Sequence, residues 1–177
     1  MPIIIKKIYG IFTVMLLGCL SSIDSHASEV TKEDKVKAAI VYKLTKFITW
    51  PEKKQTLELC VIGSGAINSE LLKINHKFSI GRRLSVTLQN QNAPLDKLCD
   101  LVYIHNTRAN DIKKILNILE NKSVLTISDN EQFAYQGGII GLFRTGSRIR
   151  FAISESATRN ASLSISSQLM GLAKVVK

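Results

Sequence analysis

The stretch LELCVIGSGAINSELLKI, residues 57–74, contains the unit on which the fold of this chain depends. Its first part, LELCVIG, is a short apolar run, and such a run next to a turn signal is typical of a buried strand. The glycines of CVIGSGAIN then lead into a brief helical pattern, GAINSELLKI. A strand followed at once by a helix is the building unit of parallel sheets, so the stretch favours an α/β fold if the unit recurs.

The unit does recur along the chain. NDIKKILNILE (residues 110–120) is predicted to be a helix between two strands, and NEQFAYQ is predicted to form one or two helical turns. The further strands predicted from apolar runs are RRLSVTLQ (82–89), LCDLVYIH (98–105) and SVLTIS (123–128). Near the C-terminus, GGIIGLFR and RIRFAIS flank Thr145-Gly146-Ser147, which is a good turn for a β-hairpin.

Two longer helices are predicted at the ends of the domain. The first begins at Thr31, has acidic residues in its first turn and ends before Pro51. Its expected buried stripe is Val36, Ala39, Ile40, Leu44, Phe47 and Ile48. The second covers SATRNASLSISSQLMGLAKVV, residues 156–176. The whole pattern predicts one α/β domain, a three-layer α/β/α sandwich with a mainly parallel sheet, a C-terminal antiparallel hairpin and a long C-terminal helix.

The first residues are typical of a secretory signal. Two lysines precede the apolar run IYGIFTVMLLGCL, which is shorter than the about 20 residues of a membrane-spanning helix. The polar segment after it ends in Ser25-His26-Ala27, which suits cleavage near Ala27. We therefore predict a signal peptide over residues 1–27, a mature domain over residues 28–177 and a periplasmic location. The alternative is a membrane-anchored lipoprotein, because LLGC resembles a lipoprotein box and would place a lipid on Cys19.

The charge balance is strongly basic. The chain contains 24 Lys and Arg against 14 Asp and Glu, a formal net charge of +10. Such a balance fits nucleic acid, anionic lipid or an acidic protein as a partner. An exported protein rarely meets nucleic acid, and the basic residues are scattered singly or in pairs. We expect a solvated basic surface and no nucleic-acid partner.

Cys60 and Cys99 are the only cysteines of the predicted mature chain. In an oxidising compartment an isolated pair is expected to form one disulfide, whereas in the cytosol the same thiols would be core residues. The predicted signal peptide favours the disulfide, which would tie neighbouring sheet elements together.

The sequence indicates no catalytic, cofactor or metal site. It has neither a G-x-S-x-G motif nor a cluster of His, Cys, Asp and Glu at ligand spacing. His76 and His105 are isolated, and a lone histidine after a strand, such as His105, is more often a hydrogen-bonded core or rim residue than a catalyst. CVIGSGAIN resembles a dinucleotide loop, but Asn68 replaces the third glycine. We predict a protein that is not an enzyme and that uses no cofactor or metal.

An ordered set of motifs resembles the YfiR-like family of periplasmic proteins. The matching pieces are VKAAIVYKLTKFITWP, LCVIG, CDLVYI, VLTISD, FAYQGGIIGL, RIRFAIS and SLSISSQLMGLAKVV. They cover nearly the whole predicted mature domain. No single piece is specific, whereas the set in this order is. Leu44 stands where the family often has an aromatic residue, and Ser154 where it often has Asn, which leaves the choice of partner open.

The resemblance implies a function in signalling. Family members are exported α/β domains that form homodimers, and the best understood bind the periplasmic sensor part of an inner-membrane diguanylate cyclase and hold it inactive. The cysteine pair that members share falls on Cys60 and Cys99, and a second pair found in some members is missing here. We expect disulfide-dependent inhibition of a cyclase that lowers cyclic di-GMP signalling and disfavours biofilm. The alternatives are a small-molecule sensor and an accessory protein of another membrane signalling or transport system.

Trp50 is the only tryptophan of the chain and stands directly before Pro51. The first interpretation is a packing wedge that covers the edge of the core. The second is a partner-binding groove that Trp50 forms with Phe47 and Tyr42, because aromatic anchors dominate interface energetics. The exposure of Trp50 distinguishes the two.

Two other pairs are candidates for partner contact. Gly137 and Gly138 precede an apolar strand, where glycine permits either close approach of another backbone or a tight turn. Arg148 and Arg150 are two residues apart and therefore share one face of a strand, which either is solvated or meets acidic residues of a partner.

Overall fold

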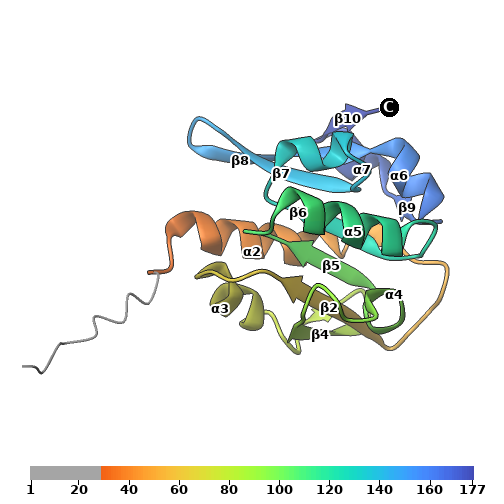
Figure 1. Ribbon diagram of the computed structural model, residues 1–177, viewed down its shortest axis with the longest axis horizontal. Helices are drawn as coiled ribbons and strands as arrows, with labels where there is room; N and C mark the ends of the chain where they lie inside the picture. The colour runs from red at the N-terminus through yellow and green to blue at the C-terminus, as the bar shows by residue number, and fades with distance from the viewer. Residues whose placement is uncertain (1–28) are drawn as a thin grey trace, which may run out of the picture.

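A computed structural model describes residues 29–177 and contains a mixed, mostly parallel sheet with short helices around it (Figure 1). The strands are β1 (Ile48–Thr49), β2 (Thr56–Ile62), β3 (Phe78–Ser79), β4 (Arg82–Leu88), β5 (Leu101–Ile104), β6 (Leu125–Ser128), β7 (Ile140–Thr145), β8 (Arg148–Ser154), β9 (Ser164–Ile165) and β10 (Lys174–Val176). The helices are α2 (Lys32–Leu44), α3 (Ile67–Leu72), α4 (Leu95–Leu98), α5 (Ala109–Leu119), the 3-10 helix η2 (Glu131–Tyr135), α6 (Glu155–Asn160) and α7 (Ser167–Met170).

The main sheet has eight strands in the order β10-β8-β7-β6-β5-β2-β4-β3. Neighbours from β4 through β2, β5 and β6 to β7 are parallel, and the predicted hairpin of β7 and β8 is antiparallel. Every residue of β5 and β6 is buried, as expected for central parallel strands that are covered on both faces. The predicted alternation of strands and helices through the middle of the chain is therefore present.

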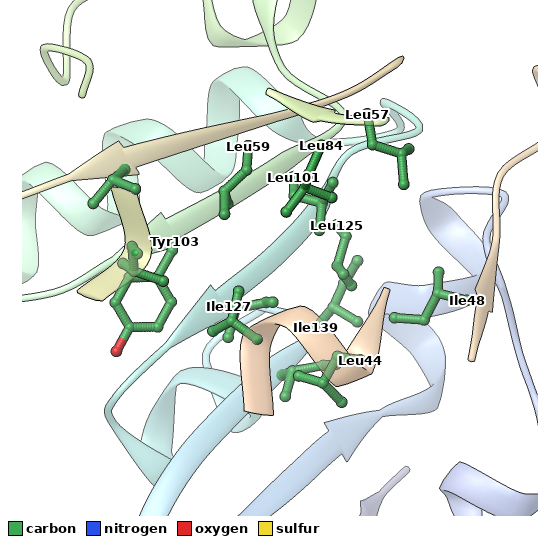
Figure 2. Packing of buried hydrophobic residues seen from close by; sticks show 14 of the residues in the cluster. Leu44, Ile48, Leu57, Leu59, Leu84, Leu101, Tyr103, Leu125, Ile127 and Ile139 are labelled. Carbon is green, nitrogen blue, oxygen red and sulfur yellow. The ribbon is translucent and has the colours of Figure 1, made fainter. Parts of the chain in front are cut away.

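Helices pack against both faces of this sheet, because successive residues of a strand point to opposite sides. Leu59 and Leu101 face a core that is shared with α2 and α3 (Figure 2). Cys60 and Val102, each one residue further along, face a second core that is shared with α4 and α5. The helices are short, and a regular three-layer sandwich is not evident.

The N-terminal helix α2 ends earlier than predicted and buries a different face. Thr31 caps it, as expected, and accepts a hydrogen bond from the Asp34 backbone N–H. The helix ends at Leu44, and β1 follows it instead of further helical turns. The buried residues are Ala38, Val41 and Leu44. The prediction was wrong for Val36 and Ala39, which are exposed. The inward face carries Lys37 instead, whose ammonium is paired with Glu33 and Asp129.

The prediction of a long C-terminal helix is wrong. The segment forms α6, β9, α7 and β10 instead. Ser162 has a positive φ of 55°, which ends the first helix, and Ser166 caps the next one. Two open strand edges determine the rest, because β9 pairs with β1 and β10 pairs with β8. The backbone hydrogen bonds that these edges require outweigh the helical pattern of the side chains.

In the part of the chain that the structure describes, no helix combines the length and the apolar character that a membrane crossing requires. The predicted signal peptide and the alternative lipid site at Cys19 lie outside residues 29–177.

Candidate functional site

Trp50 is part of the core and is not an exposed anchor. Its side chain is only 4% exposed, and its indole N–H donates a 3.1 Å hydrogen bond to the backbone oxygen of Asp100. The guanidinium of Arg82 lies 5.2 Å from the ring centroid and covers its outer side. These contacts favour the packing interpretation, and they do not provide the exposure that a partner-binding tryptophan needs.

The structure contains the disulfide between Cys60 and Cys99 that the sequence predicts. Cys60 lies within β2, and Cys99 ends α4, so the bond attaches this helix to the sheet. Both cysteines are buried in the core on the side of α4 and α5. Because Asp100 follows Cys99 directly and accepts the hydrogen bond of Trp50, the disulfide and the tryptophan share one corner of the fold.

The carboxylate of Asp100 holds this corner together. Asp100 is only 5% exposed. Its carboxylate accepts a 3.0 Å hydrogen bond from the Glu58 backbone N–H and lies 2.8 Å from the Lys54 ammonium. The hydrogen bond to Asp100 raises the pKa of Lys54 and outweighs the opposing effect of partial burial. The corner of Trp50, Asp100, Cys99 and Lys54 is therefore a connected polar and apolar unit.

Tyr42 and Phe47 are only partly buried and pack against the core on the side of α2. The Tyr42 hydroxyl donates a 2.7 Å hydrogen bond to the backbone oxygen of Phe78, which connects α2 to β3. The Lys46 ammonium lies 4.8 Å from the Tyr42 ring centroid. Of the three predicted aromatic residues, Tyr42 is therefore the one that contributes to the outer surface beside β3.

The backbone conformation at Gly137 and the packing at Gly138 explain why these two positions are glycine. Gly137 is exposed and has a φ of 97°, a conformation that residues with a Cβ rarely adopt. Gly138 is buried, and a Cβ there would overlap with the ring of Phe133. Both properties fit the tight turn between η2 and β7. A role of these glycines in partner binding stays a prediction.

Arg148 and Arg150 are exposed on the first half of β8. They lie opposite Thr145 and Phe143 of β7, whereas β10 pairs with β8 only from Ala152 onward. This part of the hairpin therefore presents two cations beside an unpaired strand edge. A partner contact by these two arginines also stays a prediction.

Sequence reasoning missed a group of polar residues at the carboxyl end of the sheet. The connection from β2 passes through α3 to β4 on one side of β2, and the connection from β5 passes through α5 to β6 on the other. At such a switch point the carboxyl ends of the strands diverge and leave a crevice in which α/β proteins commonly bind ligands. One strand further along, a cleft of about 310 Å³ lies at the carboxyl ends of β5 and β6. It is lined by residues that include His105, Asn106, Ser128 and Asp129.

His105 is held in place beside this cleft. Its Nε2 lies 2.7 Å from the Asn68 amide oxygen, and the Asn68 amide nitrogen donates to the Gly63 backbone oxygen. The amide orientation therefore makes Nε2 the protonated ring nitrogen. Burial lowers the pKa of His105 below its ordinary value. The geometry agrees with the interpretation of His105 as a hydrogen-bonded core or rim residue, and at 5% exposure the ring is buried.

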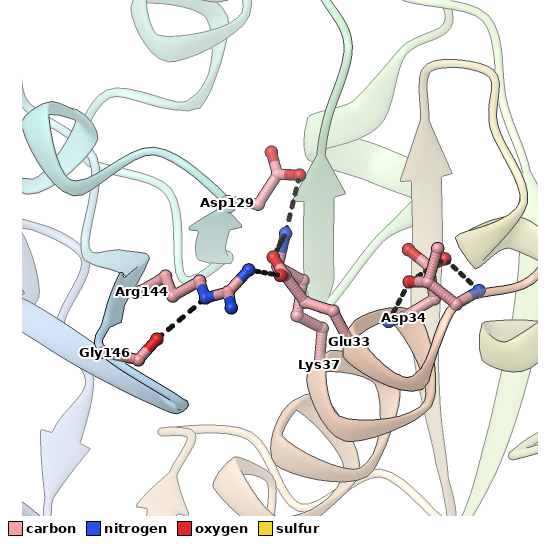
Figure 3. A network of polar contacts seen from close by, with 7 residues as sticks. Glu33, Asp34, Lys37, Asp129, Arg144 and Gly146 are labelled. Carbon is pink, nitrogen blue, oxygen red and sulfur yellow. Dashed lines mark hydrogen bonds and ion pairs between the residues drawn. The ribbon is translucent and has the colours of Figure 1, made fainter.

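Charges from three elements meet next to the cleft (Figure 3). The Lys37 ammonium lies 2.9 Å from Glu33 and 3.4 Å from Asp129, and Arg144 lies 3.5 Å from Glu33. Arg144 also donates to the backbone oxygen of Gly146 at the hairpin tip. Burial alone would lower the pKa of Lys37, but Glu33 and Asp129 outweigh it, and the pKa is raised. The network joins α2, the end of β6 and the hairpin.

The hydroxyl of Tyr103 lies deep in the core and has no hydrogen-bond partner among the described residues. Burial is the main reason why the pKa of Tyr103 is raised, with smaller contributions from Asp129 and other carboxylates. No grouping of three or more His, Cys, Asp and Glu within residues 29–177 is suited to hold a metal ion.

The fold and the corner define a mixed α/β domain in which a disulfide attaches a helix to a mostly parallel sheet. The family model described as YfiR/HmsC-like matches residues 34–174. This chain belongs to the YfiR/HmsC-like family. The match confirms the resemblance that the ordered motifs indicate.

Among solved structures, the fold is similar to that of a conserved domain protein from Vibrio cholerae O1 biovar El Tor str. N16961. The TM-score is 0.54 at 12% sequence identity, and the superposition covers 81% of this chain. It covers 60% of the other chain, so this protein spans somewhat more than half of that length. At this identity the likeness shows the fold alone.

Proposed function

We propose that this chain is a periplasmic regulatory binding protein that inhibits the external sensor domain of an inner-membrane diguanylate cyclase. The observation that carries the proposal is the family match over residues 34–174, because the best understood YfiR-like proteins act in this way. Inhibition lowers cyclic di-GMP and disfavours biofilm. The chain acts without catalysis, as an exported homodimer.

The inhibitor works by preferential binding. A binding protein shifts a conformational equilibrium only by its difference in affinity for the two states, so this chain binds the inactive sensor domain more tightly than the active one. The exposed Arg148 and Arg150 beside the unpaired edge of β8 are suited to acidic groups on that domain. We propose this edge as the contact.

The disulfide keeps the regulator competent. This proposal is supported by the position of Cys99, which anchors the backbone next to Asp100 and hence the packing of Trp50. Reduction frees α4 from β2 and loosens this corner. Inhibition is then weakened without loss of the whole sheet.

Affinity capture from membranes tests the proposal. Tagged protein comprising residues 28–177 is expected to recover a diguanylate cyclase with an external sensor domain, and the Cys60→Ala/Cys99→Ala variant is expected to recover less. Recovery of a different receptor would keep the binding function and replace the pathway. No specific partner in either form would contradict the proposal.

A matched pair of charge variants tests the contact. Arg148→Glu/Arg150→Glu is expected to reduce recovery, whereas Lys113→Glu/Lys122→Glu, with the same change of charge at other exposed positions, is expected to preserve it. An equal loss of cyclase recovery in both variants would show that binding depends on the net charge of the protein and not on Arg148 and Arg150.

A small-molecule sensor is the second candidate, and the cleft beside His105 and Asp129 favours it. This cleft lies at the carboxyl ends of β5 and β6. The carboxyl end of the sheet is the end at which open α/β sheets commonly bind ligands. Thermal unfolding in the presence of a panel of small metabolites tests the idea. A ligand that raises the midpoint of the wild type, but not of Asp129→Asn, would support it, with Asp96→Asn as the control.

A further inference from the structure

The tip of the β3–β4 hairpin carries an unexpected side chain. Ser79 pairs with Arg82, so Ile80 and Gly81 form a two-residue turn in which both φ values are positive, 48° and 76°. Such turns favour Asn-Gly, because Asn and Gly tolerate positive φ, whereas a β-branched residue at positive φ is rare. Ile80 therefore occupies a backbone position for which it is poorly suited.

The core gains nothing from this strain. Ile80 is 66% exposed and Phe78 is 65% exposed, while Ser79 between them is buried. The hairpin is nevertheless held firmly, since Tyr42 and Thr45 at the end of α2 form hydrogen bonds of 2.7 Å to Phe78 and Ser79. Two large apolar side chains thus stand on a fixed support and point to solvent. Local strain without a packing benefit is a sign of function.

The segments that form the tip and its support are basic. Neither of the two segments that meet there, residues 35–51 and 71–95, contains an Asp or a Glu. The basic side chains beside the tip are Lys46, Lys77, Arg82 and Arg83. Among the described residues none of these four has an ion-pair partner. Three of them contact aromatic rings instead, Lys46 and Lys77 at Tyr42 and Arg82 at Trp50.

We propose that this tip docks on an anionic phospholipid surface. Phe78 and Ile80 enter the boundary between headgroups and acyl chains, and the surrounding lysines and arginines contact the lipid phosphates. Apolar side chains on a polar, basic support are the combination by which peripheral proteins bind anionic membranes. The inference does not depend on the proposed cyclase partner.

The size of the tip favours lipid over an acidic protein. A stable protein interface requires about 800 Å² on each partner with a packed centre. Two apolar side chains on a two-residue turn at the sheet edge offer far less. A lipid surface needs no complementary pocket and accepts any protruding apolar group, while unpaired cations add to the attraction.

Vesicle sedimentation tests the proposal with residues 28–177. The protein is expected to bind vesicles that mix phosphatidylglycerol with phosphatidylcholine, and not to bind vesicles of phosphatidylcholine alone. Binding to the mixed vesicles is expected to weaken at high salt. Ile80→Asn is expected to weaken binding by about tenfold, because an apolar anchor is lost. Arg83→Gln is expected to weaken it by about fivefold, because one cation near the surface is lost.

The controls separate lipid binding from folding. Ile80→Asn relieves the strained turn and is expected to unfold at the same temperature as the wild type or higher. Leu172→Asn removes an equally exposed apolar side chain at the other end of the sheet, and Lys113→Gln removes a cation from α5. Both are expected to bind like the wild type.

Two results would overturn the proposal. One is equal binding to neutral and anionic vesicles, and the other is unchanged vesicle binding by Ile80→Asn. If Ile80→Asn instead abolished capture of a sensor domain while vesicle binding stayed the same, the tip would be a protein contact. If Ile80→Asn lost vesicle binding while capture of the sensor domain was preserved, the result would support the lipid-binding tip, whichever protein is the partner.

Discussion

His105 lies buried at the carboxyl end of β5, where burial lowers its pKa below 6.5. The neutral ring is therefore favoured in the folded protein. Above pH 6.5 both the folded and the unfolded protein carry a neutral His105. As the pH falls below 6.5 the unfolded chain binds the proton first, and the free energy of unfolding decreases until the folded-state pKa is reached.

We predict that a single histidine accounts for part of the acid sensitivity of the fold. Urea unfolding of the wild type above and below pH 6.5 is expected to show lower stability on the acid side. His105→Gln, which keeps a hydrogen-bond donor for Asn68, is expected to reduce this difference. His76→Gln is the control, because His76 is exposed. An unchanged difference in His105→Gln would contradict the prediction.

Gly138 allows a close approach that any side chain would prevent. We expect Gly138→Ala to lower the free energy of unfolding by about 1–3 kcal/mol, because the new Cβ overlaps with Phe133. Gly171→Ala is the control. Gly171 has a negative φ and only ordinary contacts, so alanine there is expected to be neutral or to stabilise by about 0.4–1 kcal/mol. Chemical denaturation of both variants measures the difference, and similar effects would contradict the packing argument.

At the scale of secondary-structure elements, the disulfide attaches α4 to β2 across 39 residues of chain. Such a loop restricts the unfolded state and contributes about 4 kcal/mol in the chain-entropy model. Trp50 reports on the same corner through its hydrogen bond to Asp100. It is the only tryptophan of the chain, so its emission can be assigned without ambiguity.

We predict that Cys60→Ala/Cys99→Ala remains folded but loses about 4 kcal/mol of stability in urea. The emission of Trp50 is expected to shift to longer wavelength, because the backbone around Asp100 becomes looser and admits water. Reduction of the wild type is expected to produce the same shift. A loss below about 1 kcal/mol without any spectral change would mean that the bond does not stabilise this corner.

At the scale of the whole molecule, the two ends of the sheet are closed differently. The β3–β4 end carries the apolar tip and a short edge strand, whereas β10 covers part of β8 at the opposite end (Figure 1). β10 pairs with β8 at three positions, and Lys174 lies 2.8 Å from Glu131. An uncovered edge is a site for pairing with another chain.

We predict that deletion of residues 174–177 lowers the free energy of unfolding by about 1–3 kcal/mol, because the hydrogen bonds of β10 to β8 are lost. The exposed edge of β8 is expected to increase self-association, which analytical ultracentrifugation measures. Deletion of Lys177 alone is the control, since β10 ends at Val176. Unchanged stability would mean that β10 is only loosely attached.

Local patterns were sufficient for the central strands and for the hairpin. β5 and β6 lie within the predicted segments, and α5 agrees with the predicted helix to within one residue at each end. Their apolar runs and their periods are strong. The turn at Gly146 has the positive φ that its glycine indicates. The pairing of Cys60 with Cys99 followed because the predicted mature chain has no other cysteine.

Contacts between distant segments decided the remainder. Pairing of β9 with β1 and of β10 with β8 converted an expected helix into short elements, and local patterns contain no information about open edges. Lys37 meets Asp129 although 92 residues separate them. The sequence by itself determined the alternation of strands and helices, the disulfide and the family. Only the tertiary structure decided the burial of Trp50, the cleft beside His105 and the exposure of Ile80, because burial depends on which distant elements cover a side chain.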